Sequence, residues 1–156
     1  MAAPRITATN HTAFTVSDLA KAAAFFRDIL GFPVTQVTRH QGNVAEKITG
    51  LAGAVLDILY VEAPGHRIEL IQFLAPPGRS ELVLRPCDVG FAHIAFETDD
   101  LEGVLANAME AGYTAVGPPQ RVTAGPRQGG KTVYFRGPDG IIFELQEAPK
   151  RAEGRE

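Results

Sequence analysis

Two histidines and two glutamates stand out because they recur at matching places in the two halves of the chain. His11 opens the segment His-Thr-Ala-Phe, and His93 opens His-Ile-Ala-Phe 82 residues later, each followed at the same spacing by Asp-Leu. Each half then ends in an apolar run that carries one acid, Glu69 or Glu144. The repeat therefore supplies one imidazole and one carboxylate per half.

Both acids occupy positions where a strand would be more stable with an apolar side chain. A buried, unpaired charge is so costly that it normally neutralises, pairs or binds a metal ion. Two imidazoles and two carboxylates form a mixed nitrogen and oxygen set suited to Zn, Fe, Mn, Co or Ni. Taken singly, a strand histidine is more often a hydrogen-bonded residue, and a strand glutamate more often faces solvent on an open sheet. Because one histidine and one glutamate recur in each half, binding of one divalent ion is as well supported as these ordinary roles.

The elements that would position these side chains follow the same order in each half. Residues 10–16 and 91–97 are predicted strands, and each leads into a segment with apolar residues at helical spacing. Ser17 and Asp99 stand at equivalent places before these helices and are the predicted N-cap residues. Asp18 and Asp100 are interpreted as helix-start residues rather than catalytic acids.

A glycine and three strand-like runs follow each predicted helix. Gly31 and Gly112 suit the left-handed residue that closes a helix. The turn formed by Pro138, Asp139 and Gly140 separates the last two runs. The runs are residues 34–38, 55–61 and 67–74 in the first half, and 113–117, 131–135 and 141–146 in the second. Each half is thus predicted to be β-α-β-β-β, within the α+β class.

Composition bounds the remaining possibilities. The chain has 156 residues, of which 45% are hydrophobic and 21% charged, with a net charge of −3. These values argue against disorder and against a dedicated nucleic-acid-binding protein. No apolar run reaches the roughly 18 residues that suggest a membrane span, and the N-terminus is too polar for a secretory signal. A cytoplasmic protein, with neither nucleic acid nor membrane as partner, is expected.

The set of motifs resembles the vicinal oxygen chelate superfamily, which includes glyoxalase I, methylmalonyl-CoA epimerase, extradiol dioxygenases, and fosfomycin and bleomycin resistance proteins. The resemblance covers about residues 6–147. It is carried by His11 with Asp18-Leu19, Leu30-Gly31-Phe32, Glu69, His93, and Pro138-Asp139-Gly140 before Glu144. It implies two tandem βαβββ modules forming a curled mixed sheet around a metal-centred cleft, whose ligands are His11, Glu69, His93 and Glu144.

The resemblance also implies how the chain is divided. A single domain of residues 5–147 is expected, followed by a polar tail of residues 148–156. Its parts are module one (5–74), a linker (75–88) and module two (89–147). Homodimerisation is expected because small paired modules leave open sheet edges that association commonly covers.

The ligand order His, Glu, His, Glu is similar to that of glyoxalase I and close to that of methylmalonyl-CoA epimerases. It implies a metal-dependent isomerase, epimerase or lyase that moves a proton next to a metal-bound carbonyl. Glu144 is the expected base, oriented by Gln146, with Glu69 next. Leu51 stands where those epimerases carry a second base, which weakens a literal methylmalonyl-CoA assignment.

Other residues and functions remain open at this point. Arg127, Lys131 and Tyr134 are candidate substrate-binding residues, because they lie on or beside a strand that could line the cleft. One alternative function is a metal-free protein that binds an antibiotic or metabolite and so confers resistance. The other is an Fe(II) ring-cleaving dioxygenase.

Overall fold

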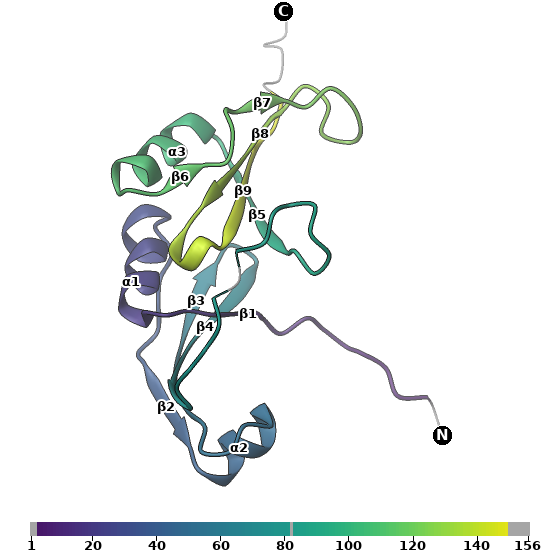
Figure 1. Cartoon of the computed structure of the whole chain (residues 1–156). Coiled ribbons are helices and arrows are strands. Elements are labelled where there is room, and N and C mark those ends of the chain that lie inside the picture. The colour runs from purple at the N-terminus through teal and green to yellow at the C-terminus, as the bar shows by residue number, and fades with distance from the viewer. Residues whose placement is uncertain (1–2, 82, 150–156) are drawn as a thin grey trace, which may run out of the picture. The chain divides into compact units, whose positions relative to one another are not determined.

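The computed structural model describes residues 3–81 and 83–149. The chain divides into two compact units, Met1–Arg79 (unit one) and Ser80–Glu156 (unit two). Each unit contains one mixed sheet with helices packed against it (Figure 1). Residues 150–156, most of the expected polar tail, lie outside the described residues. None of the helices described is long and apolar enough to cross a membrane.

Unit one has the strand order β1-β4-β3-β2, in which β1 runs parallel to β4 and the other pairs are antiparallel. The first helix, α1, ends in one π-helical stretch, η1. The elements are β1 (Thr12–Thr15), α1 (Leu19–Ala24), η1 (Phe25–Ile29), β2 (Thr38–Gln41), α2 (Asn43–Thr49), β3 (Val55–Ala63) and β4 (His66–Ala75).

Unit two repeats this arrangement with the order β5-β9-β8-β6, again with the first and last strands parallel. A short strand, β7, pairs separately with β8. The elements are β5 (His93–Thr98), α3 (Leu101–Glu110), β6 (Thr114–Ala115), β7 (Gln120–Arg121), β8 (Lys131–Arg136), the 3₁₀ turn η2 (Pro138–Gly140) and β9 (Ile142–Glu147). The α+β class and the repeated βαβββ order are confirmed.

Two local predictions are corrected. The N-cap residues are Asp18 and Asp100, one position later than predicted, because their side chains accept the amide hydrogens of Lys21 and Gly103 at 2.9 Å. Unit one also contains α2, which was not predicted. This helix has 7 residues, of which Ala45 is the buried one, so it is shorter than the helices that apolar periodicity normally identifies.

The glycine predictions hold. Gly31 and Gly112 have φ values of 72° and 90°, in the left-handed region that a side chain disfavours. In η2, Asp139 and Gly140 are both left-handed, which turns the chain sharply between β8 and β9. The η2 turn therefore sets the start of β9, the strand of unit two that carries Glu144.

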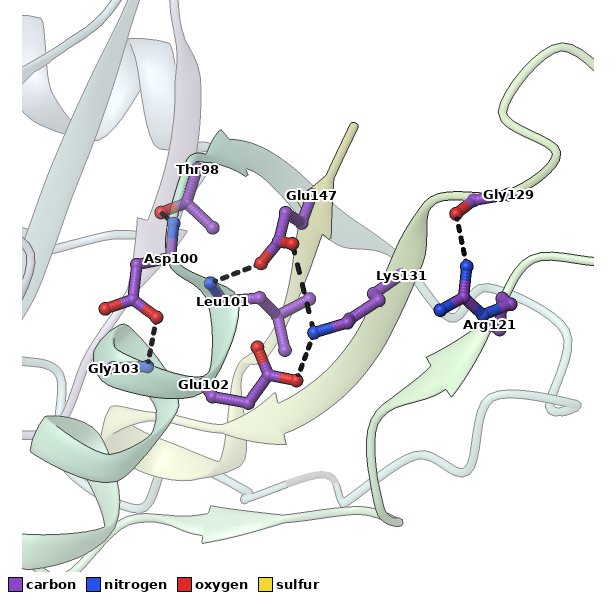
Figure 2. A network of polar contacts seen from close by, with 9 residues as sticks. All are labelled: Thr98, Asp100, Leu101, Glu102, Gly103, Arg121, Gly129, Lys131 and Glu147. Atoms are coloured by element: carbon purple, nitrogen blue, oxygen red, sulfur yellow. Dashed lines mark hydrogen bonds and ion pairs between the residues drawn. The ribbon is translucent and has the colours of Figure 1, made fainter. Parts of the chain in front are cut away.

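The last strand of each unit is tied to the start of its helix. In unit one the Leu19 amide donates to Gln72 Oε1 at 3.1 Å, and in unit two the Leu101 amide donates to Glu147 Oε2 at 3.1 Å. Figure 2 shows this contact, with Lys131 Nζ 2.6 Å from Glu102 and 3.9 Å from Glu147. Gln72 and Glu147 each lie three residues after the site glutamate of their strand, so the same strand positions both the acid and the helix.

We predict that Glu147→Ala destabilises unit two. The buried Leu101 amide loses its acceptor, and leaving such a donor unsatisfied costs about 2 kcal/mol in the free energy of unfolding. Urea denaturation followed by circular dichroism measures the loss. Glu147→Gln is the matched control, because it installs the side chain that unit one uses and keeps an acceptor oxygen. A loss as large in the Gln variant as in the Ala variant would contradict this account.

Candidate functional site

Each unit brings one histidine and one glutamate together. His11 Nε2 lies 3.4 Å from Glu69 Oε2, and His93 Nε2 lies 3.0 Å from Glu144 Oε2. The side-chain exposures match as well, at 32% and 11% in the first pair and 32% and 12% in the second. Each pair therefore presents an accessible imidazole beside a carboxylate that is mostly shielded from water.

Strand register explains why the pairs form. β1 lies beside β4 so that Ala13 is opposite Glu69, and β5 lies beside β9 so that Ala95 is opposite Glu144. The small alanine side chain leaves space over the sheet, and the histidine two residues earlier lies on the same face. The opposite face of β4 and β9 carries buried apolar residues and packs against α1 and α3.

Two tyrosines extend the repeat. Tyr60 is the cross-strand neighbour of Glu69 on β3, and Tyr134 is the neighbour of Glu144 on β8. The Tyr60 hydroxyl donates a hydrogen bond to Glu69 Oε1 at 2.7 Å. Tyr60 was not among the candidates found from sequence. A hairpin alignment of both halves would have found it, because a tyrosine precedes the acid at almost equal spacing in each.

The two carboxylates differ in how firmly they are held. Glu144 Oε1 accepts hydrogen bonds from Thr132 Oγ1 at 2.6 Å and from Gln146 Nε2 at 2.8 Å. Gln146 thus contacts Glu144, and its orienting role stays a prediction. Glu69 Oε1 accepts from Tyr60, and its other oxygen is farther from its histidine than in the second pair. Glu144 thus has more fixed contacts than Glu69.

The tyrosines also differ. The hydrogen bond to Glu69, followed by burial, raises the pKa of the Tyr60 hydroxyl. Burial, followed by the charge of Glu144, raises the pKa of Tyr134. Both phenols are therefore protonated at neutral pH. The Tyr134 ring lies 5.0 Å from the His93 ring, centroid to centroid, whereas the His11 and Tyr60 rings meet edge to face at 6.0 Å.

A cavity borders each pair. In unit one a cavity of about 580 Å³ is lined by His11, Tyr60 and Glu69 together with residues of β2, α2, β3 and β4. In unit two a cavity of about 290 Å³ is lined by Tyr134 and Glu144 among others. A concave, mainly apolar space with a few polar groups is the usual form of a small-molecule site.

The other sequence candidates lie elsewhere. Lys131 pairs across the strands with Glu147, so its side chain lies on the α3 side of the sheet, opposite to Glu144 (Figure 2). Arg127 forms an ion pair with Glu97. Of the three candidate substrate-binding residues, Tyr134 is the one placed beside a His–Glu pair.

Each His–Glu pair provides two of the four ligands that the predicted divalent-ion site requires. Each provides one imidazole nitrogen and one carboxylate oxygen, held by neighbours that orient a ligand, as supporting hydrogen bonds do in metal sites. Within residues 3–81 and 83–149, no group of three or more histidine, cysteine, aspartate or glutamate side chains suited to a metal is gathered. Each unit thus holds two candidate ligands.

Comparison with known proteins gives a family match over most of the chain. The model of the Glyoxalase/Bleomycin resistance protein/Dioxygenase superfamily matches residues 8–145. The 2-epi-5-epi-valiolone epimerase of Actinomyces sp is 32% identical over 154 residues, covering 96% of this chain and 84% of the relative. An ethylmalonyl-CoA/methylmalonyl-CoA epimerase of Cereibacter sphaeroides is 29% identical, with 88% and 96% covered.

Solved structures share the fold. A glyoxalase family protein from Bacillus cereus superposes with a TM-score of 0.83 at 24% identity, covering 96% of this chain and 99% of that one. The fosfomycin resistance protein FosX from Listeria monocytogenes, solved with Mn(II) and sulfate, gives a TM-score of 0.61 at 18% identity, with 94% and 96% covered.

We predict that Tyr60→Phe weakens Mn²⁺ binding about tenfold, because Glu69 loses the donor that orients it and such supporting contacts are worth 10–100-fold in metal affinity. Isothermal titration calorimetry measures the change. Tyr134→Phe is the matched control. Its hydroxyl makes no hydrogen bond to Glu144 within the described structure, so its affinity should stay within about twofold of the wild type. Equal losses in both variants would contradict the role of Tyr60.

Proposed function

Because the chain belongs to the Glyoxalase/Bleomycin resistance protein/Dioxygenase superfamily, we propose that it is a metal-dependent epimerase or isomerase of the glyoxalase I or methylmalonyl-CoA epimerase type. It moves a proton next to the carbonyl of a small oxygenated substrate. The observation that carries this proposal is the recurrence of one His–Glu pair in each unit. The two epimerases at 32% and 29% identity support it.

His11, Glu69, His93 and Glu144 together hold one divalent ion in this proposal. When bound, such an ion polarises a substrate carbonyl and so acidifies the neighbouring C–H bond. The chain's own groups then carry the proton. A carboxylate oxygen accepts the proton from carbon as general base and later donates it as general acid. Delivery by the same carboxylate to the neighbouring carbon isomerises the substrate, whereas inversion of the same carbon requires a second proton donor on its opposite face.

The contacts favour Glu69 as the proton carrier ahead of Glu144. A general base must turn its carboxylate toward the substrate carbon, which is easier when fewer hydrogen bonds hold that carboxylate in place. Glu144 accepts two side-chain hydrogen bonds on one oxygen and faces its histidine with the other. Glu69 accepts one, and it borders the larger cavity. We therefore assign the proton transfer to Glu69 and a fixed ligand role to Glu144, which reverses the order expected from sequence.

The metal assignment predicts about one divalent ion per set of four ligands. His93→Ala should strongly reduce metal content, because the second pair loses its nitrogen donor. Inductively coupled plasma mass spectrometry of protein purified without chelator measures the ratio. His66→Ala is the control, since His66 contacts Thr12 rather than a site carboxylate and should keep full occupancy. Full occupancy in His93→Ala would remove this residue from the ligand set.

We further propose that the protein is a homodimer. The edge strand β2 is exposed along its whole length, and association commonly covers such edges. Light scattering of the metal-analysis sample checks this against the chain mass of 16.7 kDa.

The proton-transfer assignment predicts deuterium incorporation at carbon. Methylmalonyl-CoA, ethylmalonyl-CoA and 2-epi-5-epi-valiolone are suitable probes, because the relatives are named for acting on them or for producing them. Incubated in deuterated water, at least one should exchange its acidic hydrogen, as followed by proton NMR. At saturating Mn²⁺, Glu69→Gln should slow exchange at least about 100-fold, within the usual range for loss of a general base.

Glu144→Gln, with its metal content measured in parallel, serves as the comparison. It should retain more exchange than Glu69→Gln, since an amide can still ligate weakly. The opposite order would return the base to Glu144. Oxygen consumption without exchange in the wild-type protein would instead favour a dioxygenase.

A further inference from the structure

The cavity of unit one has Glu69 at one end and apolar side chains at the other. Three cross-strand pairs of β3 and β4 follow one another on the same face of the sheet: Tyr60–Glu69, then Ile58–Ile71, then Leu56–Phe73. All six residues line the cavity. At about 3.3 Å per strand residue, the apolar pairs extend roughly 13 Å from Glu69. An uncharged stripe thus leads directly away from the proposed base.

Helix α2 supplies the facing wall. Ala45 is buried in a cluster with Ala54 and Leu56, and this contact seats the helix on the sheet. Val44 and Ile48, one helical turn apart, line the cavity although they are 67% and 80% exposed. Figure 1 shows α2 directly after β2, at the end of the unit-one sheet. These two apolar side chains therefore remain available to a ligand.

The charged group at the rim is already neutralised. Arg39 also lines the cavity, but its guanidinium makes two hydrogen bonds of 2.8 Å to the Asp57 carboxylate. This ion pair lowers the pKa of Asp57 mainly through the hydrogen bonds from Arg39. The charge of Arg39 is therefore already compensated within the chain.

Unit two differs at the equivalent places. Beyond Tyr134–Glu144, the next cross-strand pair is Thr132–Gln146, both polar and both engaged with Glu144. The stretch that corresponds to α2 contains β7 and a loop instead of a helix. Each unit therefore contains a His–Glu pair. The apolar wall lies beside the pair of unit one, whereas polar residues lie beside the pair of unit two.

We infer that the unit-one cavity holds a hydrocarbon substituent of the substrate, with Val44 and Ile48 as specificity-determining residues. This inference rests on the proposed function for the position of the reacting carbonyl, at the Glu69 end. The substrate class is then a carbonyl compound with an alkyl or aryl body. A polyhydroxylated ring fits poorly, because hydroxyls buried against Ile58, Ile71 and Phe73 would lose their hydrogen bonds to water.

Straight-chain 2-oxo acids test this inference. Pyruvate, 2-oxobutanoate, 2-oxohexanoate and 2-oxooctanoate share one head group and differ in chain length. Isothermal titration calorimetry on the Mn²⁺-loaded protein should show Kd falling two- to fourfold for each added methylene, the effect of burying CH₂ groups. Ile48→Asn and Val44→Asn should each reduce this increment to less than twofold. Both residues are exposed, so the fold tolerates the change.

Met109→Asn is the matched control, because Met109 is also an exposed apolar residue of a helix but belongs to α3 of the other unit and is not part of the cavity lining. It should keep the wild-type increment. Affinity that is independent of chain length, or equal losses in Met109→Asn, would overturn the inference.

Different experimental outcomes would contradict the proposed function and the inference about the cavity. Absence of metal and of proton exchange, with chain-length dependence that still requires Ile48, would leave an apolar binding cavity without the proposed chemistry. Metal binding and exchange without chain-length dependence would leave the chemistry and remove the cavity's role.

Discussion

Alternation along β4 and β9 is the constraint on which both units depend. Successive side chains of a strand point to opposite faces, so Ile68 and Leu70 pack fully buried beneath α1 while Glu69 faces the other way. The same division places Phe143 and Leu145 against α3 and Glu144 on the opposite face. The apolar residues fix the register, because a shift by one residue would expose the core and bury the acid among the helices. Chemistry on one face is therefore held in place by packing on the other.

The helix contacts strengthen this arrangement. Gln72 and Glu147 lie on the core face and accept the first amide of the helix that follows the histidine strand. Asp18 and Asp100 then satisfy the next free amides. Because the histidine lies a few residues before the helix and the acid three residues before the acceptor, one hydrogen bond links the segments that carry both site residues. Movement of the helix relative to the strand would displace the histidine from its glutamate.

Sequence patterns predicted the parts of this structure that depend on local chemistry. The positive-φ glycines, the apolar runs and the repeated His and Glu positions are all visible along the chain, and the structure places each histidine beside the glutamate of its own unit. Features that depend on cross-strand register were not visible. Tyr60 is nine positions from Glu69 in sequence, and only the antiparallel pairing of β3 with β4 makes them neighbours. Helix α2 escaped prediction for a different reason: with 7 residues it is too short to show a sustained apolar period.

Duplication of one module gives both units the same His–Glu pair, but the two pairs have different surroundings. The differences lie in the residues next to the two acids. Thr132 and Gln146 surround Glu144 with donors, whereas Ile58 and Ile71 surround Glu69 with hydrocarbon. The unit whose glutamate has fewer fixed contacts is also the unit whose cavity has the apolar wall. The proposed proton acceptor and the proposed binding wall for the substrate body are therefore neighbours on β3 and β4.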